Sequence, residues 1–391
     1  ARGRPLRRPL RPLGADPDGD RLPFTHPIPA REARSAWSRG ERPATGSGGT
    51  ASGRMGAPCA RSGAVDDSGR FHRAVSHRGL PPLVAAVLTA IGAILATWPL
   101  VRRLGDATLG SGEVLLTAWQ LNWFHQALLT DPRAWVHANI FFPYGNAATY
   151  NDLLLTHAAA TLPLAWLDSP VLALNVALLG GIVLCAVFAH LLIVELTDAP
   201  WAGAVGATLF ALTPFRFLHL PHLSIAASWA VPLFFWALLR HLRRPSWTWA
   251  ALAVASGVAV AASSLYHAAY VAPVIPLVLL FGAGRGPGGR PRWLPLVAFG
   301  VPGLALVFSL LAPYASALRT VGVAAAPSDL MRYGADLTSL ARRPSFLQAA
   351  EATAGLNPEA RLYPGLGLAL LALAGALWVV AAGRPRPVSY T

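Results

Sequence analysis

Apolar segments of bilayer-spanning length recur along the chain from residue 80 onward, separated by short polar stretches. A transmembrane helix needs roughly 20 mostly apolar residues, so this pattern predicts an all-α polytopic membrane protein with about 8 transmembrane helices. The predicted spans lie at about 80–101, 171–196, 202–218, 224–241, 247–264, 266–282, 293–318 and 362–382.

The segment 150–167 competes as a ninth span, but it carries Asp152 and His157. Ionisable groups are costly at bilayer depth. A span there would also invert every later segment and place the arginines that follow residue 239 outside. We therefore predict that 150–167 is a juxtamembrane or re-entrant helix on the outer face.

Arginines set the predicted orientation, because cytoplasmic loops carry an excess of Lys and Arg. With eight spans, all four arginine clusters of the chain lie on the same side of the membrane. The clusters are Arg78; Arg240, Arg243 and Arg244; Arg285, Arg290 and Arg292; and Arg384 and Arg386. We predict that both termini are cytoplasmic, and that two large loops, about 102–170 and 319–361, lie outside.

Composition supports a membrane protein and argues against a nucleic-acid partner. Hydrophobic residues make up 54% of the chain and charged residues 13%, with a mean hydropathy of +0.46, whereas soluble domains have about 25% charged residues. The net charge is +14, and residues 1–80 hold 15 arginines and 7 acidic residues, which is +8 of that total. The charge therefore sits mostly in one tail. Two cysteines provide no disulfide or metal framework.

The Arg/Pro/Gly-rich residues 1–78 show no apolar periodicity, and we predict that they form a disordered tail. Residues 79–391 form the predicted transmembrane domain. The chain opens on Ala1 rather than Met, for which a fragment or a wrongly extended reading frame are two explanations.

An acidic residue opens a helical pattern immediately after the first span. Glu113 follows Gly110 and Gly112, and Trp119 and Trp123 then repeat at helical spacing, which suits a helix lying in the membrane interface. Glu113 is either a simple capping acid, favoured by the helix dipole, or a carboxylate held at headgroup level beside a lipid-linked substrate. His125, on the same helix, is either a packing residue or a substrate ligand.

Polar and aromatic residues also gather in three later segments of the predicted outer face. The segment 137–152 is a predicted structured loop whose Asn139, Tyr144 and Asp152 suit a sugar site, although a turn-rich connection explains them equally well. In 263–270, Tyr266 and His267 either complete this cavity or anchor a tight turn.

The third segment, 213–223, carries Arg216, His219 and His222. An arginine binds phosphate through its planar fork of donors, and membrane-interface snorkelling is the alternative. The three-residue spacing of His219 and His222 is compatible with two ligands of one metal ion, but zinc needs three or four convergent ligands. No third ligand follows from the spacing, so we predict neither a metal nor a cofactor.

Several of these segments together resemble the bacterial GT-C superfamily of polytopic glycosyltransferases, which use polyprenyl-phosphate sugars. The resemblance covers roughly residues 80–382. It rests on the motifs W-x-L-x-W-x-x-x-A-L (Trp119–Leu128), ANIFFP (Ala138–Pro143), PFRFLHLPHL (Pro214–Leu223) and EARLYPG (Glu359–Gly365).

The resemblance implies transfer of a sugar from a polyprenyl-phosphate donor to an acceptor, on the outer face of the bacterial cytoplasmic membrane. Glu113 would be the catalytic base, and Arg216 would stabilise the departing phosphate. The chain departs from the superfamily pattern in carrying Glu rather than Asp at the first position, and in lacking the second acid, for which Asp106 is the nearest upstream residue. Alternatives are a non-catalytic binder or transporter of lipid-linked glycans, and a truncated, inactive relative.

Overall fold

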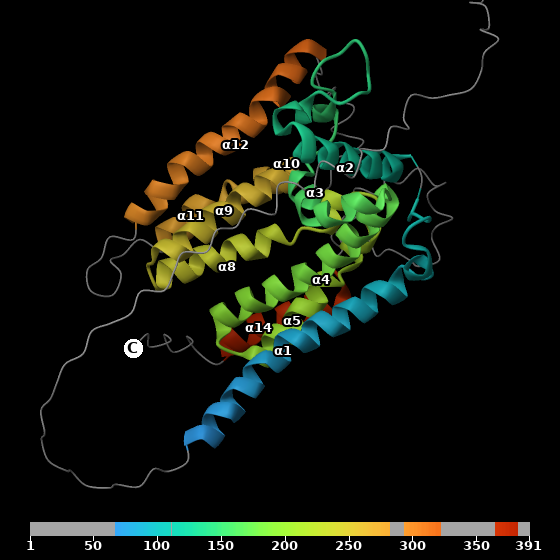
Figure 1. Cartoon of the computed structure of the whole chain (residues 1–391). Helices are drawn as coiled ribbons and strands as arrows, with labels where there is room; N and C mark the ends of the chain where they lie inside the picture. The colour runs from blue at the N-terminus through green and yellow to red at the C-terminus, as the bar shows by residue number, and fades with distance from the viewer. Residues whose placement is uncertain (1–66, 111, 282–292, 322–363, 382–391) are drawn as a thin grey trace, which may run out of the picture. The chain divides into compact units, whose positions relative to one another are not determined.

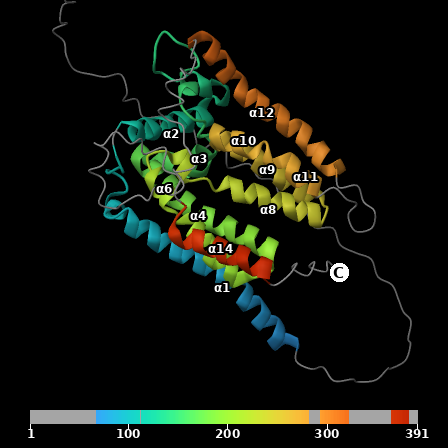
Figure 2. The same ribbon diagram turned by 180° about the vertical axis from the view of Figure 1, so that it is seen from behind.

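The computed structural model describes residues 67–110, 112–281, 293–321 and 364–381, all of which belong to one compact unit within Val65–Thr391. Every regular element in these ranges is a helix, and no strand occurs in them. The predicted all-α class is confirmed for this part of the chain (Figures 1 and 2).

The helices fall into long apolar ones and short connecting ones. The long helices are α1 (Asp67–Ala96), α4 (Pro170–Thr197), α5 (Pro200–Ala211), α8 (Ala230–Arg243), α9 (Trp247–Ser263), α12 (Trp293–Val321) and α14 (Leu366–Ala381), with α2 (Glu113–Thr130) preceding α4. The short ones are η1 (Leu100–Arg103), η2 (Pro132–Val136), η3 (Ala147–Tyr150), α3 (Leu155–Thr161), η4 (Leu162–Leu167), α6 (Pro214–Leu218), α7 (Leu223–Ala226), α10 (Leu265–Val271) and α11 (Val274–Phe281).

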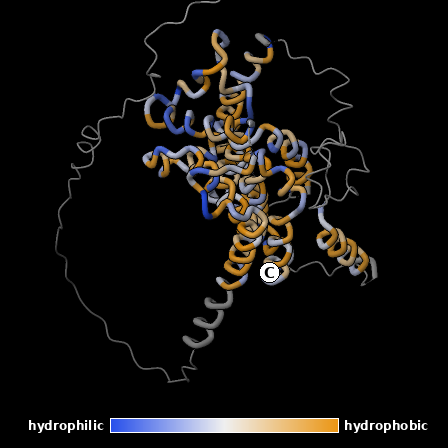
Figure 3. Tube along the Cα trace, turned by 90° about the vertical axis from the view of Figure 1, so that its right-hand side faces the viewer, coloured by the Kyte–Doolittle hydropathy of each residue, from blue (hydrophilic) through white to orange (hydrophobic). Residues whose placement is uncertain are grey.

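Among the described residues, five helical segments are long and apolar enough to cross a bilayer, which is typical of a polytopic membrane protein. They are Gly79–Ala96, Pro170–Thr197, Pro200–Leu218, Leu223–Arg243 and Trp293–Arg319. The three other predicted spans coincide with shorter apolar helices at Trp247–Ser263, Leu265–Leu280 and Leu366–Trp378. Hydrophobic residues run along the long helical tubes (Figure 3). The total of eight spans stays a prediction.

Two sequence boundaries can be compared with the helices. Helix α1 begins at Asp67, inside the predicted tail of residues 1–78, whose first 66 residues lie outside the described ranges. Extending an existing helix adds one hydrogen bond per residue ordered, so a span can continue into polar sequence. The segment 150–167 forms only the short helices α3 and η4, and neither is a candidate span, as predicted.

Helix α4 is central to the packing, because it contacts α1, α2, α5 and α8. Small side chains allow these close approaches: Ala189 of α4 packs in one buried cluster with Ala85 of α1 and Ala204 and Ala207 of α5. Lipid removes the hydrophobic driving force between helices, so close van der Waals contact between small residues takes its place.

Replacing Gly181 by Val is expected to destabilise the fold by about 1–3 kcal/mol, because overpacking forces neighbouring backbone to shift. A Cβ at Gly181 would lie 2.4 Å from the Cβ of Ala227 and 3.2 Å from its Cα. The neighbouring Gly180 has nothing within 4 Å of its Cβ position, so Gly180→Val is the matched control. Thermal unfolding in detergent measures both; equal midpoints for the two variants would contradict this packing.

An ion-pair cluster joins α4 and α8 near the end of α4 that lies far from α2. Arg240 donates to Oε2 of Glu195 at 2.6 Å, and Arg243 donates to Oε1 at 3.0 Å and also to the Glu195 carbonyl. The Arg240 guanidinium also lies over the rings of Trp236 and Trp249. Two of the arginines that set the predicted orientation are therefore committed to a structural contact as well.

Candidate functional site

Helix α2 begins at Glu113, and the backbone before it takes a shape that favours glycine. Gly110 has φ 120° and Gly112, the N-cap, has φ 64°, a region that side chains rarely adopt. The Glu113 carboxylate does not fold back to cap its own helix. Its Oε1 lies 2.8 Å from Nδ1 of His222, with 48% of the Glu113 side chain and 26% of the His222 side chain exposed.

Glu113 and His222 form part of the wall of a cavity of about 560 Å³. Asp152 and Tyr266 line the same cavity, so four of the ten predicted site residues converge there. The remaining wall comes from Thr117, Thr149, Tyr150, Asn151, Leu154, Leu223, Ser224, Ile225, Leu265 and Tyr314. The contributing segments are α2, the 149–154 loop, α7, α10 and α12, which meet at the end of the long helices where α2 lies (Figures 1 and 2).

Asp152 is held rigidly by backbone donors and by α2. Its Oδ1 accepts hydrogen bonds from the N–H of Leu153 at 3.0 Å and of Leu265 at 2.8 Å. The buried Gln120 donates to the Asp152 carbonyl at 2.8 Å and accepts from the Asn151 side-chain amide at 2.9 Å. The cavity wall is therefore coupled to the helix that carries Glu113.

His157 lies buried behind this wall. Its Nε2 lies 3.2 Å from the Ala227 carbonyl. Burial lowers the pKa of His157 to about 4, although the Ala227 carbonyl and the charge of Asp152 act in the opposite direction. His157 is therefore neutral at pH 7, and it supports the wall instead of lining it.

The structure places Arg216 and His219 in the interior and not in the cavity wall. Arg216 is 4% exposed; it donates to the Ala226 carbonyl, and at 3.2 Å each to Ser228 Oγ and Cys185 Sγ. His219 is buried too, with Nδ1 2.8 Å from the Phe215 carbonyl. The predicted direct contact of Arg216 with the substrate is thus not seen in this geometry, because its NH1 and NH2 groups donate to interior acceptors and its Nε is buried without a partner among the described residues.

Four further predicted residues also lie outside the cavity wall. His125 is buried, with Nε2 3.1 Å from both the Ala158 carbonyl and Thr161 Oγ1, and burial lowers its pKa. These interior contacts favour the packing interpretation of His125. Asn139 and Tyr144 are exposed. His267 is half-buried and close enough to interact electrostatically with Asp152.

The structure adds site residues that sequence reasoning missed, notably Thr117, Asn151 and Tyr314, with Gln120 behind them. One signal was present: Glu113, Thr117 and Gln120 recur at i, i+4 and i+7, which is a single helix face. Tyr314 comes from α12, and its hydroxyl donates to the Asn151 carbonyl at 3.1 Å. No local pattern marks that contact.

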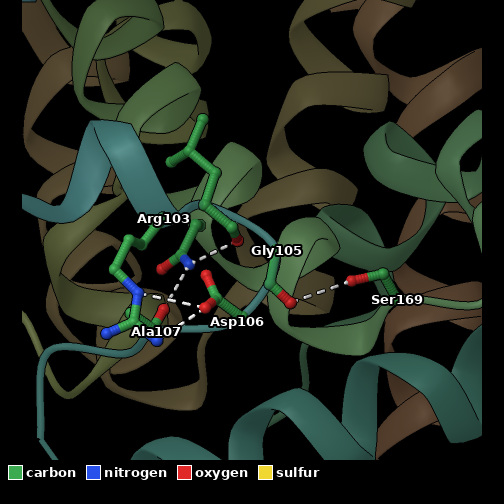
Figure 4. A network of polar contacts seen from close by, with 7 residues as sticks. Arg103, Gly105, Asp106, Ala107 and Ser169 are labelled. Carbon is green, nitrogen blue, oxygen red and sulfur yellow. Dashed lines mark hydrogen bonds and ion pairs between the residues drawn. The ribbon is translucent and has the colours of Figure 1, made fainter.

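The segment that leads to Glu113 is anchored on α4. The buried Asn175 donates to the carbonyls of Leu104 and Ala107, both at 2.8 Å, and Ser169 Oγ donates to the Gly105 carbonyl at 3.3 Å. Figure 4 shows this network together with the exposed ion pair between Arg103 and Asp106. The loop is therefore fixed by the buried amide, since the exposed pair contributes little.

Asn175→Ala is expected to lower the free energy of unfolding by about 1–3 kcal/mol, because two backbone carbonyls lose a buried donor. The measurement is the thermal unfolding midpoint in detergent. Asn122→Ala is the control, since Asn122 is a half-buried amide on α2 outside this network. If Asn175→Ala and the control have the same thermal unfolding midpoint, the Asn175 amide does not anchor this loop.

No group of three or more His, Cys, Asp or Glu within the described ranges is arranged to hold a metal ion. The rings of His219 and His222 lie 6.0 Å apart, and one of them is buried. The EARLYPG motif lies outside the described residues except for its last two positions.

A family model described as a domain of unknown function, DUF6311, matches residues 117–390, which is most of the chain. Glu113 precedes the matched region, and the other cavity-lining residues fall within it. No curated protein and no solved structure matches the chain.

Proposed function

The chain belongs to the DUF6311 family, and we propose that it is a GT-C-type membrane glycosyltransferase. It moves a sugar from a polyprenyl-phosphate donor to an acceptor on the outer face of the bacterial cytoplasmic membrane, with both termini cytoplasmic. The observation that carries the proposal is the half-exposed Glu113 carboxylate, held by His222 in the wall of a polar cavity at the ends of the apolar helices.

The size and lining of the cavity support a sugar ligand. Small-molecule sites typically measure about 300–1,000 Å³, and this cavity falls in that range. Tyr150, Tyr266 and Tyr314 supply aromatic surfaces with hydroxyl groups, and Asn151, Thr117 and Ser224 supply further donors and acceptors. A sugar needs this combination, because it has both polar hydroxyl edges and apolar C–H faces.

The proposed reaction uses Glu113 as the base. Glu113 takes the proton of the acceptor hydroxyl as that oxygen attacks the anomeric carbon of the sugar. The bond between the anomeric carbon and the phosphate oxygen breaks, and polyprenyl phosphate leaves with both bonding electrons. Asp152, whose Oδ1 is fixed by two backbone donors, orients the sugar through the polar wall around it.

The position of the cavity suits a donor that is partly embedded in lipid. Helix α12 contributes Tyr314 to the wall and leaves apolar side chains such as Leu304 and Phe308 exposed along its length. A polyprenyl chain can lie in the surrounding lipid while its phosphate and sugar reach the cavity. Arg216 holds the 226–228 segment beneath the wall, which is a positioning role.

The test supplies purified protein in detergent with polyprenyl-phosphate sugars and a hydroxyl acceptor, and measures release of polyprenyl phosphate together with the glycosylated product. Transfer that depends on protein and donor supports the proposal. Binding of the donor without product would favour a lipid-linked glycan binder or transporter instead.

A further inference from the structure

Breaking the bond to phosphate raises a charge problem within the cavity. A polyprenyl phosphosugar carries one negative charge on its phosphodiester, whereas the departing phosphate monoester carries two. Developing charge of this kind needs a preorganised positive group or donor. The described residues that line the cavity include two carboxylates, Glu113 and Asp152, but no arginine, and the chain has no lysine.

Arg216 does not meet this need in the observed arrangement. Its guanidinium is buried, its NH1 and NH2 donate to three interior acceptors, and it lies 5.5 Å from the centre of the Phe210 ring. Turning it into the cavity would leave the Ala226 carbonyl without this donor. Arg216 therefore links α6 to the end of α7 and the turn after it.

We infer that the imidazolium form of His222 is the group that contacts the phosphate, and that Glu113 and the phosphate share it in turn. Among the described side chains that line the cavity, His222 is the one whose residue type can carry a positive charge. It lies 2.8 Å from the proposed base and is itself partly exposed. This inference rests on the proposed function, because it names the phosphate-binding residue of the same site.

The charges balance through one exchange. Before reaction the His222 imidazolium pairs with the Glu113 carboxylate. When Glu113 takes the acceptor proton its charge falls to zero, and at the same moment the departing phosphate gains one negative charge. The imidazolium then pairs with the phosphate, so proton removal and departure of the leaving group support each other. His222 gives up no proton in this step.

The sharing of His222 between Glu113 and the phosphate can be tested by ligand binding alone, without measuring sugar transfer. Glu113→Gln removes the carboxylate that competes for His222, so the purified full-length variant should bind farnesyl phosphate more tightly, by about threefold to tenfold. His222→Gln should bind it about tenfold or more weakly, because a charge-assisted hydrogen bond is lost. His222→Arg should restore binding. The double variant Glu113→Gln/His222→Gln should show no tightening.

Binding is followed by native mass spectrometry or calorimetry in detergent. Farnesol tests the contribution of the lipid chain alone, and inorganic phosphate tests the charge alone. His137→Gln is the matched control, because His137 is exposed and does not line the cavity. Matching thermal unfolding midpoints of all variants exclude misfolding as the cause.

Unchanged farnesyl phosphate affinity in His222→Gln, or equal binding of farnesol and farnesyl phosphate, would overturn the inference. Unchanged or weakened binding in Glu113→Gln would also overturn the shared role of His222. If the variants bind farnesyl phosphate as expected but the protein transfers no sugar, the proposed glycosyltransferase function is refuted. The inference that His222 binds phosphate then still holds. The two failures are therefore distinguishable.

Discussion

Glu113→Gln is expected to lower the rate of sugar transfer by about 10²–10⁴-fold, the usual contribution of a general base. The amide keeps the size of the side chain, and its oxygen can still accept from His222, but it cannot take a proton from the acceptor hydroxyl. Because Glu113 is half exposed at the first turn of α2, the variant should insert and fold normally. Single-turnover release of polyprenyl phosphate measures the effect.

Asp106→Asn is the matched control for this experiment. Asp106 lies in the same loop, and its side chain is 61% exposed and paired with Arg103. The hydrogen bond from Arg103 lowers the pKa of Asp106, so Asp106→Asn removes one negative charge from this loop at neutral pH. Its loss should leave transfer near the wild-type rate. Full activity in Glu113→Gln would remove Glu113 as the base, while an equal loss in both variants would point to general loop charge.

Glu195→Gln is expected to cost about 1–3 kcal/mol of folding free energy, because a largely buried carboxylate is removed from its charge-assisted hydrogen bonds with two half-buried arginines. The Glu195 side chain is 9% exposed, and it compensates two guanidinium groups, on Arg240 and Arg243. Without the carboxylate, Arg240 keeps its contacts with the tryptophan rings and Arg243 keeps the Glu195 carbonyl, but neither guanidinium has the negative charge of Glu195 beside it. The thermal midpoint in detergent should fall sharply.

Asp198→Asn provides the control for Glu195→Gln. Asp198 is exposed at the C-terminal end of α4 with φ 55°, a conformation that Asn tolerates well. Its change in stability should stay within about 0.5 kcal/mol. A Glu195→Gln protein that unfolds at the wild-type temperature would show that α4 and α8 are held by apolar packing alone.

The helices could be predicted from the sequence, because few backbone conformations are possible within lipid. A chain that crosses a bilayer must satisfy its backbone hydrogen bonds internally, and a long apolar segment then becomes a helix. The prediction that 150–167 does not span followed from the cost of Asp152 and His157 at bilayer depth, and α3 and η4 are indeed short. Helix α1 begins earlier than the predicted span, because apolar composition indicates the part of a helix that suits lipid. It does not indicate the residue at which the helix begins.

The site was accessible only in part. Glu113, Asp152, His222 and Tyr266 were recognised as polar residues beside apolar helices, and they converge on one cavity. Arg216 was placed at the substrate because arginine suits phosphate, yet its guanidinium turns inward. Sequence shows the type of a side chain, but the direction in which it points depends on acceptors that packing brings close.

The sequence by itself determined the helical class and the apolar segments of bilayer-spanning length with polar residues gathered between them, because the length of apolar segments and the avoidance of charge in lipid are local properties. Only the tertiary structure decided that His222 meets Glu113 and that Tyr314 reaches Asn151. These contacts join residues more than a hundred positions apart. They depend on how helices with small side chains pack, and no local pattern carries that information.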